Sequence, residues 1–344
     1  MTRWNWLRYA AAGTALALIT TGCSLGGSKE IDPPPVGYEM NVNPESVAVN
    51  AGAQQQLRTT AFFLDAEGFV APLNIQVAST DAIAKETLKY MVEDGPVQSQ
   101  LPKGFRALLP KGTQVNGIDI RQDEKLAIVD FSKEFTNYNI QDERKILEAI
   151  TWSLTSFPSV EKVQLWVDGK QLKEMPMDGT PLDAPLSRQT LGINIEAAEG
   201  VNFSKASAVT LYFMNQTEDS KGYYVPVTRL IAQTDDLAKA TVSELIKGPS
   251  KASLASVVMP TAELLNAAVT DELATVDFSD KLLGPDQKAP SEALQAVVLS
   301  LTETTGADKV QIKVNGNAKV TSTANDANYS VPVSRPVHIN DIKL

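Results

Sequence analysis

Two aspartates in matching positions are the residues of this chain that most invite a chemical role. Asp130 follows the apolar run 126–129, and Asp277 follows a similar run 147 residues later. Paired carboxylates are the groups with which glycosidases cleave sugar polymers. A plainer interpretation is that an aspartate at the end of a strand accepts hydrogen bonds from the backbone N–H groups of a turn. The plainer interpretation is favoured, because a catalytic pair would have to form between two separate domains.

Other catalytic residue types are scarce in this sequence. It contains one cysteine, Cys23, and one histidine, His338, so it offers no Cys/His metal site, no Cys–His pair and no intramolecular disulfide. His338 alternates with Val337 and Ile339, which predicts a half-buried or exposed strand residue rather than a base. The segment 111–113 is too short to cradle a phosphate. We therefore expect no catalytic residue, no cofactor and no metal.

The charge balance argues against nucleic acid as a partner. The 344 residues include 31 basic and 41 acidic side chains, a formal net charge of −10. Loss of a leader that carries Arg3 and Arg8 would bring the charge to about −12. A chain this acidic lacks the basic surface that nucleic acid requires, and it would be weakly repelled by anionic lipids and wall polymers.

The chain is a tandem duplication of one domain. Residues 126–132 (LAIVDFS) return as 273–279 (LATVDFS), and four further landmarks return at the same spacing. These pairs are Ser153-Leu154-Thr155 with Ser300-Leu301-Thr302, Lys162-Val163-Gln164 with Lys309-Val310-Gln311, Asp168-Gly169 with Asn315-Gly316, and Ser187-Arg188 with Ser334-Arg335. A period of this length is that of a domain and not of a solenoid repeat. We place the first domain at 58–196 and the second at 205–344.

Each repeat predicts the same order of elements, β-β-α-β-β-α-β-β. Alternating and helical apolar patterns predict these strands and helices: a hairpin at 60–77 and 209–231, a helix at 81–93 and 235–247, a strand at 115–120, strands at 126–131 and 273–278, a helix at 142–156 and from 291, strands at 162–167 and 309–314, and closing extended segments at 191–195 and 337–342. Gly95-Pro96 and Gly248-Pro249 are expected to end the first helices. Asp142 and Ser291 are the expected N-caps of the second helices.

This order predicts the α+β class: two tandem homologous domains, each a mainly antiparallel sheet with two helices packed on one face. The dipeptides 168–169 and 315–316 suit two-residue hairpin turns, because both central positions of such turns need positive φ. Trp166 alternates with the inward Val163 and Leu165, so we expect it to face outward. An outward aromatic is a candidate interaction residue, although a lone surface or inter-domain aromatic is the commoner case.

The first 22 residues are typical of a signal peptide. Arg3 and Arg8 precede a short apolar stretch that is too brief to span a bilayer comfortably, and Gly22 comes directly before Cys23. This pattern resembles a bacterial lipobox, apart from Thr20 where such boxes usually carry leucine. The resemblance implies cleavage after Gly22 and acylation, such as palmitoylation, of Cys23, which would anchor the protein to the outer face of the cell membrane. Plain secretion is the alternative. Residues 23–57 are expected to form a flexible tether.

The Gly-Pro segment, the Leu-Pro-x-Gly-Thr segment at 109–113, the Val-Asp-Phe-Ser strands and the strand at 163–169 together resemble the GerMN domain. Over 58–344 the chain is similar to sporulation and spore-germination lipoproteins with two such domains, although the second copy lacks the Gly-Thr. The resemblance implies a fold like that of ring-building domains and a non-enzymatic envelope protein. It also implies a role in assembling the channel between mother cell and forespore, with envelope and channel proteins as partners and a possible homo- or hetero-oligomeric ring.

Two other functions stay open at this stage. A peptidoglycan-directed hydrolase or binder would use Asp130, Asp277 or another carboxylate. A small-ligand-binding lipoprotein ranks last, because the repeats do not show the βαβ alternation of periplasmic-type binding proteins.

Overall fold

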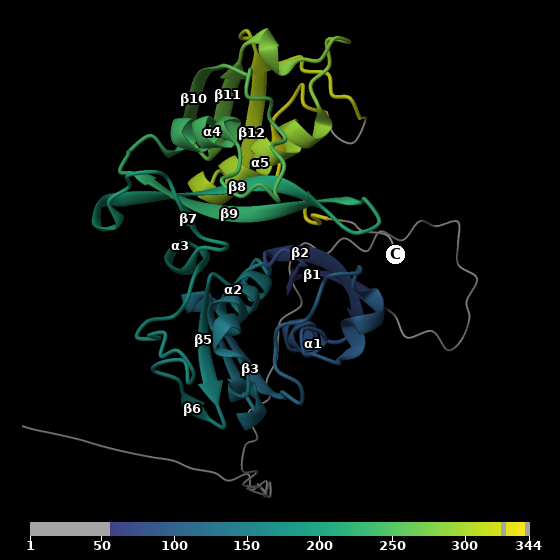
Figure 1. The fold of residues 1–344 in the computed structure, drawn as a ribbon, viewed down its shortest axis with the longest axis vertical. Coiled ribbons are helices and arrows are strands. Elements are labelled where there is room, and N and C mark those ends of the chain that lie inside the picture. The colour runs from purple at the N-terminus through teal and green to yellow at the C-terminus, as the bar shows by residue number, and fades with distance from the viewer. Residues whose placement is uncertain (1–55, 325–327, 341–344) are drawn as a thin grey trace, which may run out of the picture. The chain divides into compact units, whose positions relative to one another are not determined.

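The computed structural model describes residues 56–324 and 328–340 (Figure 1). The proposed signal peptide, Cys23 and most of the tether therefore lie outside the described residues. Within the described ranges, no helix has the length and apolar character needed to cross a membrane. The same ranges hold no cluster of His, Cys, Asp and Glu side chains suited to a metal ion.

The first repeat begins with a hairpin and continues with a four-stranded sheet. Its elements are β1 (Gln56–Leu64), β2 (Val70–Ala78), α1 (Ile83–Tyr90), β3 (Val115–Arg121), β4 (Leu126–Phe131), α2 (Glu143–Leu154), β5 (Lys162–Val167), β6 (Lys170–Gln171) and α3 (Arg188–Leu191), with short 3-10 turns between them. β7 (Glu196–Ala197) follows in the segment that leads to the second repeat.

The second repeat follows the same plan. Its elements are β8 (Ala206–Gln216), β9 (Gly222–Ala232), α4 (Leu237–Lys247), β10 (Leu264–Thr270), β11 (Leu273–Phe278), α5 (Ser291–Thr305), β12 (Lys309–Val314) and β13 (Val333–Ser334). Figure 1 shows α5 beside the hairpin β8–β9 and α2 beside the hairpin β1–β2. The α+β class and the tandem arrangement are confirmed.

The strands of each repeat are divided between two sheets, where the sequence pattern suggested one. The hairpin is separate from the larger sheet: β1 and β2 form a two-stranded sheet, and β8 and β9 form a sheet of order β7-β9-β8. The remaining strands form sheets of order β3-β4-β5-β6 and β10-β11-β12-β13. Most neighbours are antiparallel, but β4–β5 and β11–β12 are parallel because α2 and α5 serve as crossover helices. The short β7 also pairs parallel with β9. Each repeat thus contains one βαβ unit that the sequence analysis did not recognise.

The same apolar positions build the core in both repeats. Ala127, Val129 and Phe131 on β4 are fully buried, as are their counterparts on β11. A helix serine fixes each hairpin to its crossover helix: the Ser153 hydroxyl accepts from the Phe62 N–H at 2.9 Å, and the Ser300 hydroxyl accepts from the Tyr212 N–H at 3.0 Å. The recurring Ser-Leu-Thr of the sequence therefore marks the contact between helix and hairpin.

Helix boundaries in the first repeat differ from the prediction. α1 ends at Tyr90, and Gly95-Pro96 opens a separate 3-10 turn at Pro96–Gln100. In the second repeat Gly248 ends α4 with φ 83°, as expected. Asp142 takes the predicted N-cap position of α2, but its carboxylate binds the Arg106 guanidinium at 2.8 Å and makes no capping bond. The predicted N-cap of α5 is wrong, because Pro290 takes that position and Ser291 is the first residue of the helix.

The predicted closing segments are not strands at the expected places. Residues 188–191 form the short helix α3, because Ser187 and Thr190 make a reciprocal capping box. In the second repeat the closing strand is the two-residue β13, and residues 337–340 belong to no strand. His338 is half-buried, as predicted, but it lies outside any strand, so its predicted place in a strand is wrong. The end of that segment, 341–342, lies outside the described residues.

Candidate interaction surfaces and the junction between the repeats

Each of the two aspartates holds a hairpin turn of its own repeat. The Asp130 carboxylate accepts a hydrogen bond from the Gly169 N–H at 2.9 Å, and the Asp277 carboxylate accepts from the Gly316 N–H at 2.9 Å. The turn residue before each glycine, Asp168 or Asn315, has a positive φ of 47° or 49°. The two aspartates belong to separate sheets, β4 in one and β11 in the other. The structural interpretation of these residues is confirmed.

Trp166 lies on β5, half-buried, next to Asp130 in the parallel register of the sheet. Its indole N–H donates to the Gln164 side-chain oxygen at 3.3 Å. The second repeat carries Lys313 at this position. A partner-binding role for Trp166 stays a prediction.

Two asparagines join the hairpins of the two repeats. The Asn194 amide accepts from the Val70 N–H and donates to the carbonyl oxygens of Val70 and Pro226, each at 2.8 Å. Residues 70 and 226 lie on β2 and β9, so one side chain holds a strand of each repeat. The asparagine lies in the left-handed region at φ 45°.

The second asparagine makes the reciprocal set of contacts. The Asn340 amide accepts from the Tyr224 N–H at 2.6 Å and donates to the carbonyl oxygens of Tyr224 and Pro72 at 2.8 Å. Val70 and Tyr224 are equivalent in the two repeats, and so are Pro72 and Pro226. Each repeat therefore presents the same patch to the other, as the two halves of an isologous dimer do. We call this patch, with the two asparagines and strands β2 and β9, the junction.

A cluster of charged side chains lies beside the junction. Arg188 and Arg335 both bind the Glu303 carboxylate at 2.9 Å, so a residue of the first repeat and one of the second share one acid. Arg188 lies over the Trp152 ring, and Arg335 lies over the Tyr212 ring. Burial raises the pKa of Glu303, but the two guanidinium groups outweigh it and hold the pKa below its ordinary value.

The duplicated arginines have equivalent local roles. Arg188 donates to the Trp152 carbonyl and to the hydroxyls of Thr155 and Ser156 near the end of α2. Arg335 donates to the Leu299 carbonyl and the Thr302 hydroxyl near the end of α5. One difference bears on the charges: Ser156 of the first repeat is replaced by Glu303 in the second. That replacement brings both arginines onto one side chain.

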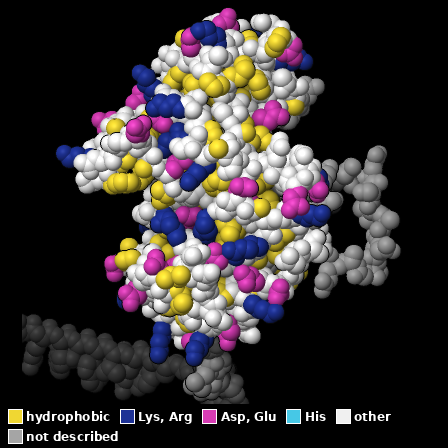
Figure 2. Space-filling view, viewed as in Figure 1, with side chains coloured by type: hydrophobic (Ala, Val, Ile, Leu, Met, Phe, Trp, Pro, Cys, Tyr) yellow, Lys and Arg dark blue, Asp and Glu magenta, His cyan; other side chains and the backbone are white. Residues whose placement is uncertain are grey.

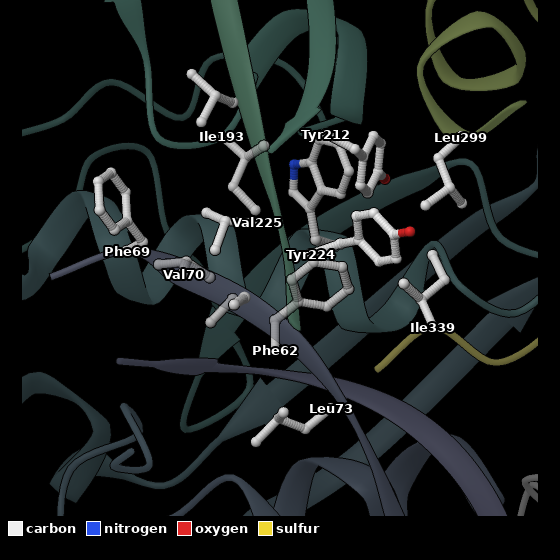
Figure 3. Packing of buried hydrophobic residues seen from close by; sticks show 14 of the residues in the cluster. Phe62, Phe69, Val70, Leu73, Ile193, Tyr212, Tyr224, Val225, Leu299 and Ile339 are labelled. Atoms are coloured by element: carbon white, nitrogen blue, oxygen red, sulfur yellow. The ribbon is translucent and has the colours of Figure 1, made fainter. Parts of the chain in front are cut away.

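Apolar side chains from both repeats fill the junction. Figure 3 shows Phe62 and Val70 of the first repeat pointing toward Tyr224 and Val225 of the second, with Ile193 and Ile339 beside them. All of these residues are less than 10% exposed and belong to one continuous hydrophobic cluster. Asp65 adds a buried polar contact, because its carboxylate accepts from the Tyr223 hydroxyl at 2.8 Å. Burial raises the pKa of the Tyr223 hydroxyl, and the neighbouring Asp65 carboxylate raises it further.

Next to the junction is a hollow with charged walls. Its volume is about 670 Å³, and its lining includes Arg144, Lys145, Glu148, Lys251 and Glu67. Figure 2 shows Lys and Arg side chains interleaved with acidic ones over this middle part of the molecule. Burial raises the pKa of Glu148, which is bonded to Arg144. Charges of both signs line this hollow, so it shows no preference for an anion or a cation.

Sequence reasoning missed the junction. The recurrence of Ser-Arg is visible in the sequence, but it predicts no role for Arg188 or Arg335. The Ile-Asn pair at 193–194 recurs at 339–340, but the second repeat is one residue shorter just before it, so an ungapped comparison of the repeats does not align the two asparagines. An alignment that allowed this gap could have found the two asparagines.

Comparison with known proteins shows the family. A family model described as "Germane: Sporulation and spore germination" matches twice, at residues 60–173 and 210–320. The chain is 38% identical over 352 residues to "Spore germination protein GerM" of Bacillus subtilis (strain 168), covering 94% of each sequence. The chain belongs to the Germane family.

A solved structure shows the same arrangement for a Germane relative. The chain matches "Tandem GerMN domains of the sporulation protein GerM from Bacillus subtilis" with a TM-score of 0.76 and 39% sequence identity. The match covers 83% of this chain and 99% of that one. It therefore extends over both repeats, so this chain is a two-repeat Germane protein of the sporulation type. Neither description names an enzymatic activity.

Proposed function

We propose that this Germane protein is a non-enzymatic scaffold of the cell envelope in sporulation and spore germination. In this role it would engage envelope proteins that assemble the channel between mother cell and forespore. The observation that carries the proposal is the similarity to Bacillus subtilis GerM, which extends over both repeats in sequence and in structure. Two repeats joined by buried contacts are suited to presenting several surfaces to partners.

The same proposal includes a lipid anchor. Gly22-Cys23 after a basic and apolar leader supports cleavage and acylation at Cys23, which would place the folded repeats at the outer face of the membrane. One or two acyl chains supply membrane affinity in proportion to the methylene groups they bury. Residues 23–57 would then serve as the tether.

The alternative of a peptidoglycan hydrolase has less support. Asp130 and Asp277 are each occupied by a backbone N–H of their own repeat. A glycosidase needs two carboxyl groups within about 10 Å of each other on either side of one bond, whereas these two aspartates lie in different sheets.

The experiment is complementation of a Bacillus subtilis strain that lacks GerM, scored by heat-resistant spores. We expect the wild-type chain to restore spores, and the Asp130→Asn/Asp277→Asn variant to restore them equally, because asparagine keeps the acceptor oxygen. Cys23→Ser should leave the membrane fraction and lose most of the activity. Full loss in the double asparagine variant, with normal protein levels, would favour the hydrolase.

Mild cross-linking in sporulating cells, with growing cells as control, tests the partners. Recovery of channel proteins only during sporulation is the expected result. Recovery of wall fragments alone, in both growth states, would contradict the scaffold.

A further inference from the structure

The two repeats differ sharply at one edge of their four-stranded sheets. β3 and β10 occupy the same place, at the end of the strand order, and each pairs with one neighbour only among the described residues. Such an edge leaves a row of backbone N–H and C=O groups without partners in the sheet. Proteins commonly protect these edges with charged side chains, lysine above all.

The edge of the first repeat is protected. β3 has the sequence VNGIDIR, so Asp119 and Arg121 place charges along it. In addition, the Lys85 ammonium on α1 donates to the Asn116 carbonyl at 2.9 Å, at the irregular point of the strand. A second strand could not approach this edge without displacing the lysine and burying charge.

The edge of the second repeat lacks this protection. β10 has the sequence LLNAAVT, which contains no charged residue. Leu265 stands where the first repeat has Asn116, and its side chain is 53% exposed. Val269 is 42% exposed, and Ala268 and Thr270 replace the charged Asp119 and Arg121.

The edge has an acidic end. Asp271 and Glu272 form the turn that follows β10, both at positive φ, and neither makes an ion pair within the described residues. At the other end Glu263 is paired with Lys281. If a second copy of β10 paired antiparallel about Ala267, Glu263 would face Asp271, which sets like charges across the new strand pair. A partner with basic residues at one end avoids this repulsion.

From these contacts we infer that β10 is the docking edge for an extended segment of another protein, with alternating apolar residues and a basic end. The segment adds as a fifth strand to the sheet of the second repeat. Its backbone satisfies the free groups of β10, and its basic end lies against Asp271 and Glu272. The inference describes the kind of segment that a partner of the proposed scaffold would contain. Binding of that segment requires only the folded repeats.

The test uses synthetic peptides with the full chain. The probe is a nine-residue peptide of alternating valine and threonine with two lysines at one end, and the readouts are fluorescence anisotropy and amide hydrogen exchange. We expect the peptide to slow amide exchange across 264–270 and to leave exchange across 115–121 unchanged. A peptide with two glutamates in place of the lysines should bind at least tenfold more weakly, as should one with alternate N-methylated amides.

Variants of the two edge strands test whether the peptide binds at β10. Leu265→Asn/Ala268→Asp/Thr270→Arg gives β10 the side chains that protect β3, and should weaken binding at least tenfold. The matched change on the first repeat, Asn116→Leu/Asp119→Ala/Arg121→Thr, should leave binding to β10 unchanged. Ala268→Asp alone is the substitute if the triple variant does not fold.

The inference is wrong if no peptide binds, if the protected and wild-type edges bind equally, or if the acidic peptide binds as well as the basic one. A doubled mass in sedimentation without peptide, abolished by Ala268→Asp, would also overturn it, since a second copy would then occupy β10. The peptide assay requires neither sporulation nor the lipid anchor. A failure here therefore leaves the complementation result of the scaffold proposal standing, and the reverse is also true.

Discussion

Position 303 shows how one substitution differentiates the two repeats. Glu303 balances two partly buried arginines, Arg188 and Arg335, whose side chains are 20% and 26% exposed. Glu303→Ser, which restores the residue of the first repeat, should lower the free energy of unfolding by about 2 to 3 kcal/mol, because it leaves two cations together without an acid. Urea unfolding followed by tryptophan fluorescence measures the loss.

The control for this prediction is an exposed ion pair. Glu263→Ser removes the partner of Lys281, and both side chains there are more than half exposed. Exposed pairs contribute about 0 to 1 kcal/mol, so this variant should unfold close to the wild type. Equal losses in the two variants would contradict a special role for Glu303.

A second residue gives the protein a defined response to acid. The Glu143 carboxylate accepts hydrogen bonds from the backbone N–H groups of residues 177, 178 and 180 and from the hydroxyls of Thr180 and Tyr138. Burial raises the pKa of Glu143, but these hydrogen bonds outweigh burial and lower the pKa to about 2. Since the folded pKa is below the ordinary value, the ionised carboxylate stabilises the fold above about pH 4.5 and loses this effect as the pH falls toward 2.

The prediction is a difference in slope. Between pH 5 and pH 2 the wild type should lose about 2 kcal/mol more stability than Glu143→Gln, because the variant has no proton to take up at this position. Thermal unfolding at a series of pH values gives both slopes. Parallel curves for the two proteins would mean that the loop 177–180 does not depend on the charge of Glu143.

Among the elements, the two hairpin turns offer a direct test of backbone conformation. Gly316 has φ 77°, and a Cβ added there would meet nothing within 4 Å. Gly316→Ala should therefore cost about 1 kcal/mol for conformational reasons alone. Gly316→Asn should cost less, because asparagine tolerates the left-handed region better. The urea midpoint should be highest for the wild type, lower for Gly316→Asn and lowest for Gly316→Ala. Equal midpoints for the three proteins would exclude a strained turn.

Elements with a local sequence signal were predictable. The alternation of Ala127, Val129 and Phe131 located β4, and the dipeptides 168–169 and 315–316 identified both turns with their positive φ values. Elements that depend on distant contacts were missed. The segment 188–191 became a helix through the Ser187–Thr190 capping box, and the parallel pairing of β4 with β5 depends on the position of α2.

The same distinction applies to the candidate site. The structural role of Asp130 and Asp277 followed from their place at the end of a strand before a turn. The asparagines of the junction could not be assigned a role in this way, because each one bonds to strands more than 30 residues away in the chain. A single sequence carries no pattern for such a contact.

For the whole molecule, the junction determines whether the two repeats unfold together. Asn194→Ala removes two donated bonds and one accepted bond at the contact of β2 with β9, and it leaves polar backbone groups without a partner. Asn340→Ala removes the reciprocal set. Each variant should lose about 2 to 3 kcal/mol, and the double variant should unfold in two calorimetric transitions where the wild type shows one.

The exposed Asn202 is the matched control, since within the described part of the chain its side-chain oxygen accepts from Ser204, two residues away, and from no other residue. Asn202→Ala should keep a single transition near the wild-type temperature. A single transition in the double junction variant would mean that the apolar contacts suffice to couple the repeats.

The reciprocity of the junction also limits how long such an array can become. A tandem whose repeats meet head to tail presents a free face after every addition, so it can grow without limit. Here the two repeats meet through like patches, one with Asn194 and one with Asn340, and each patch is covered by the other. A third copy appended to this chain would find no patch left to bind. Two is thus the natural count for this contact, and any larger assembly has to be built through other surfaces of the molecule.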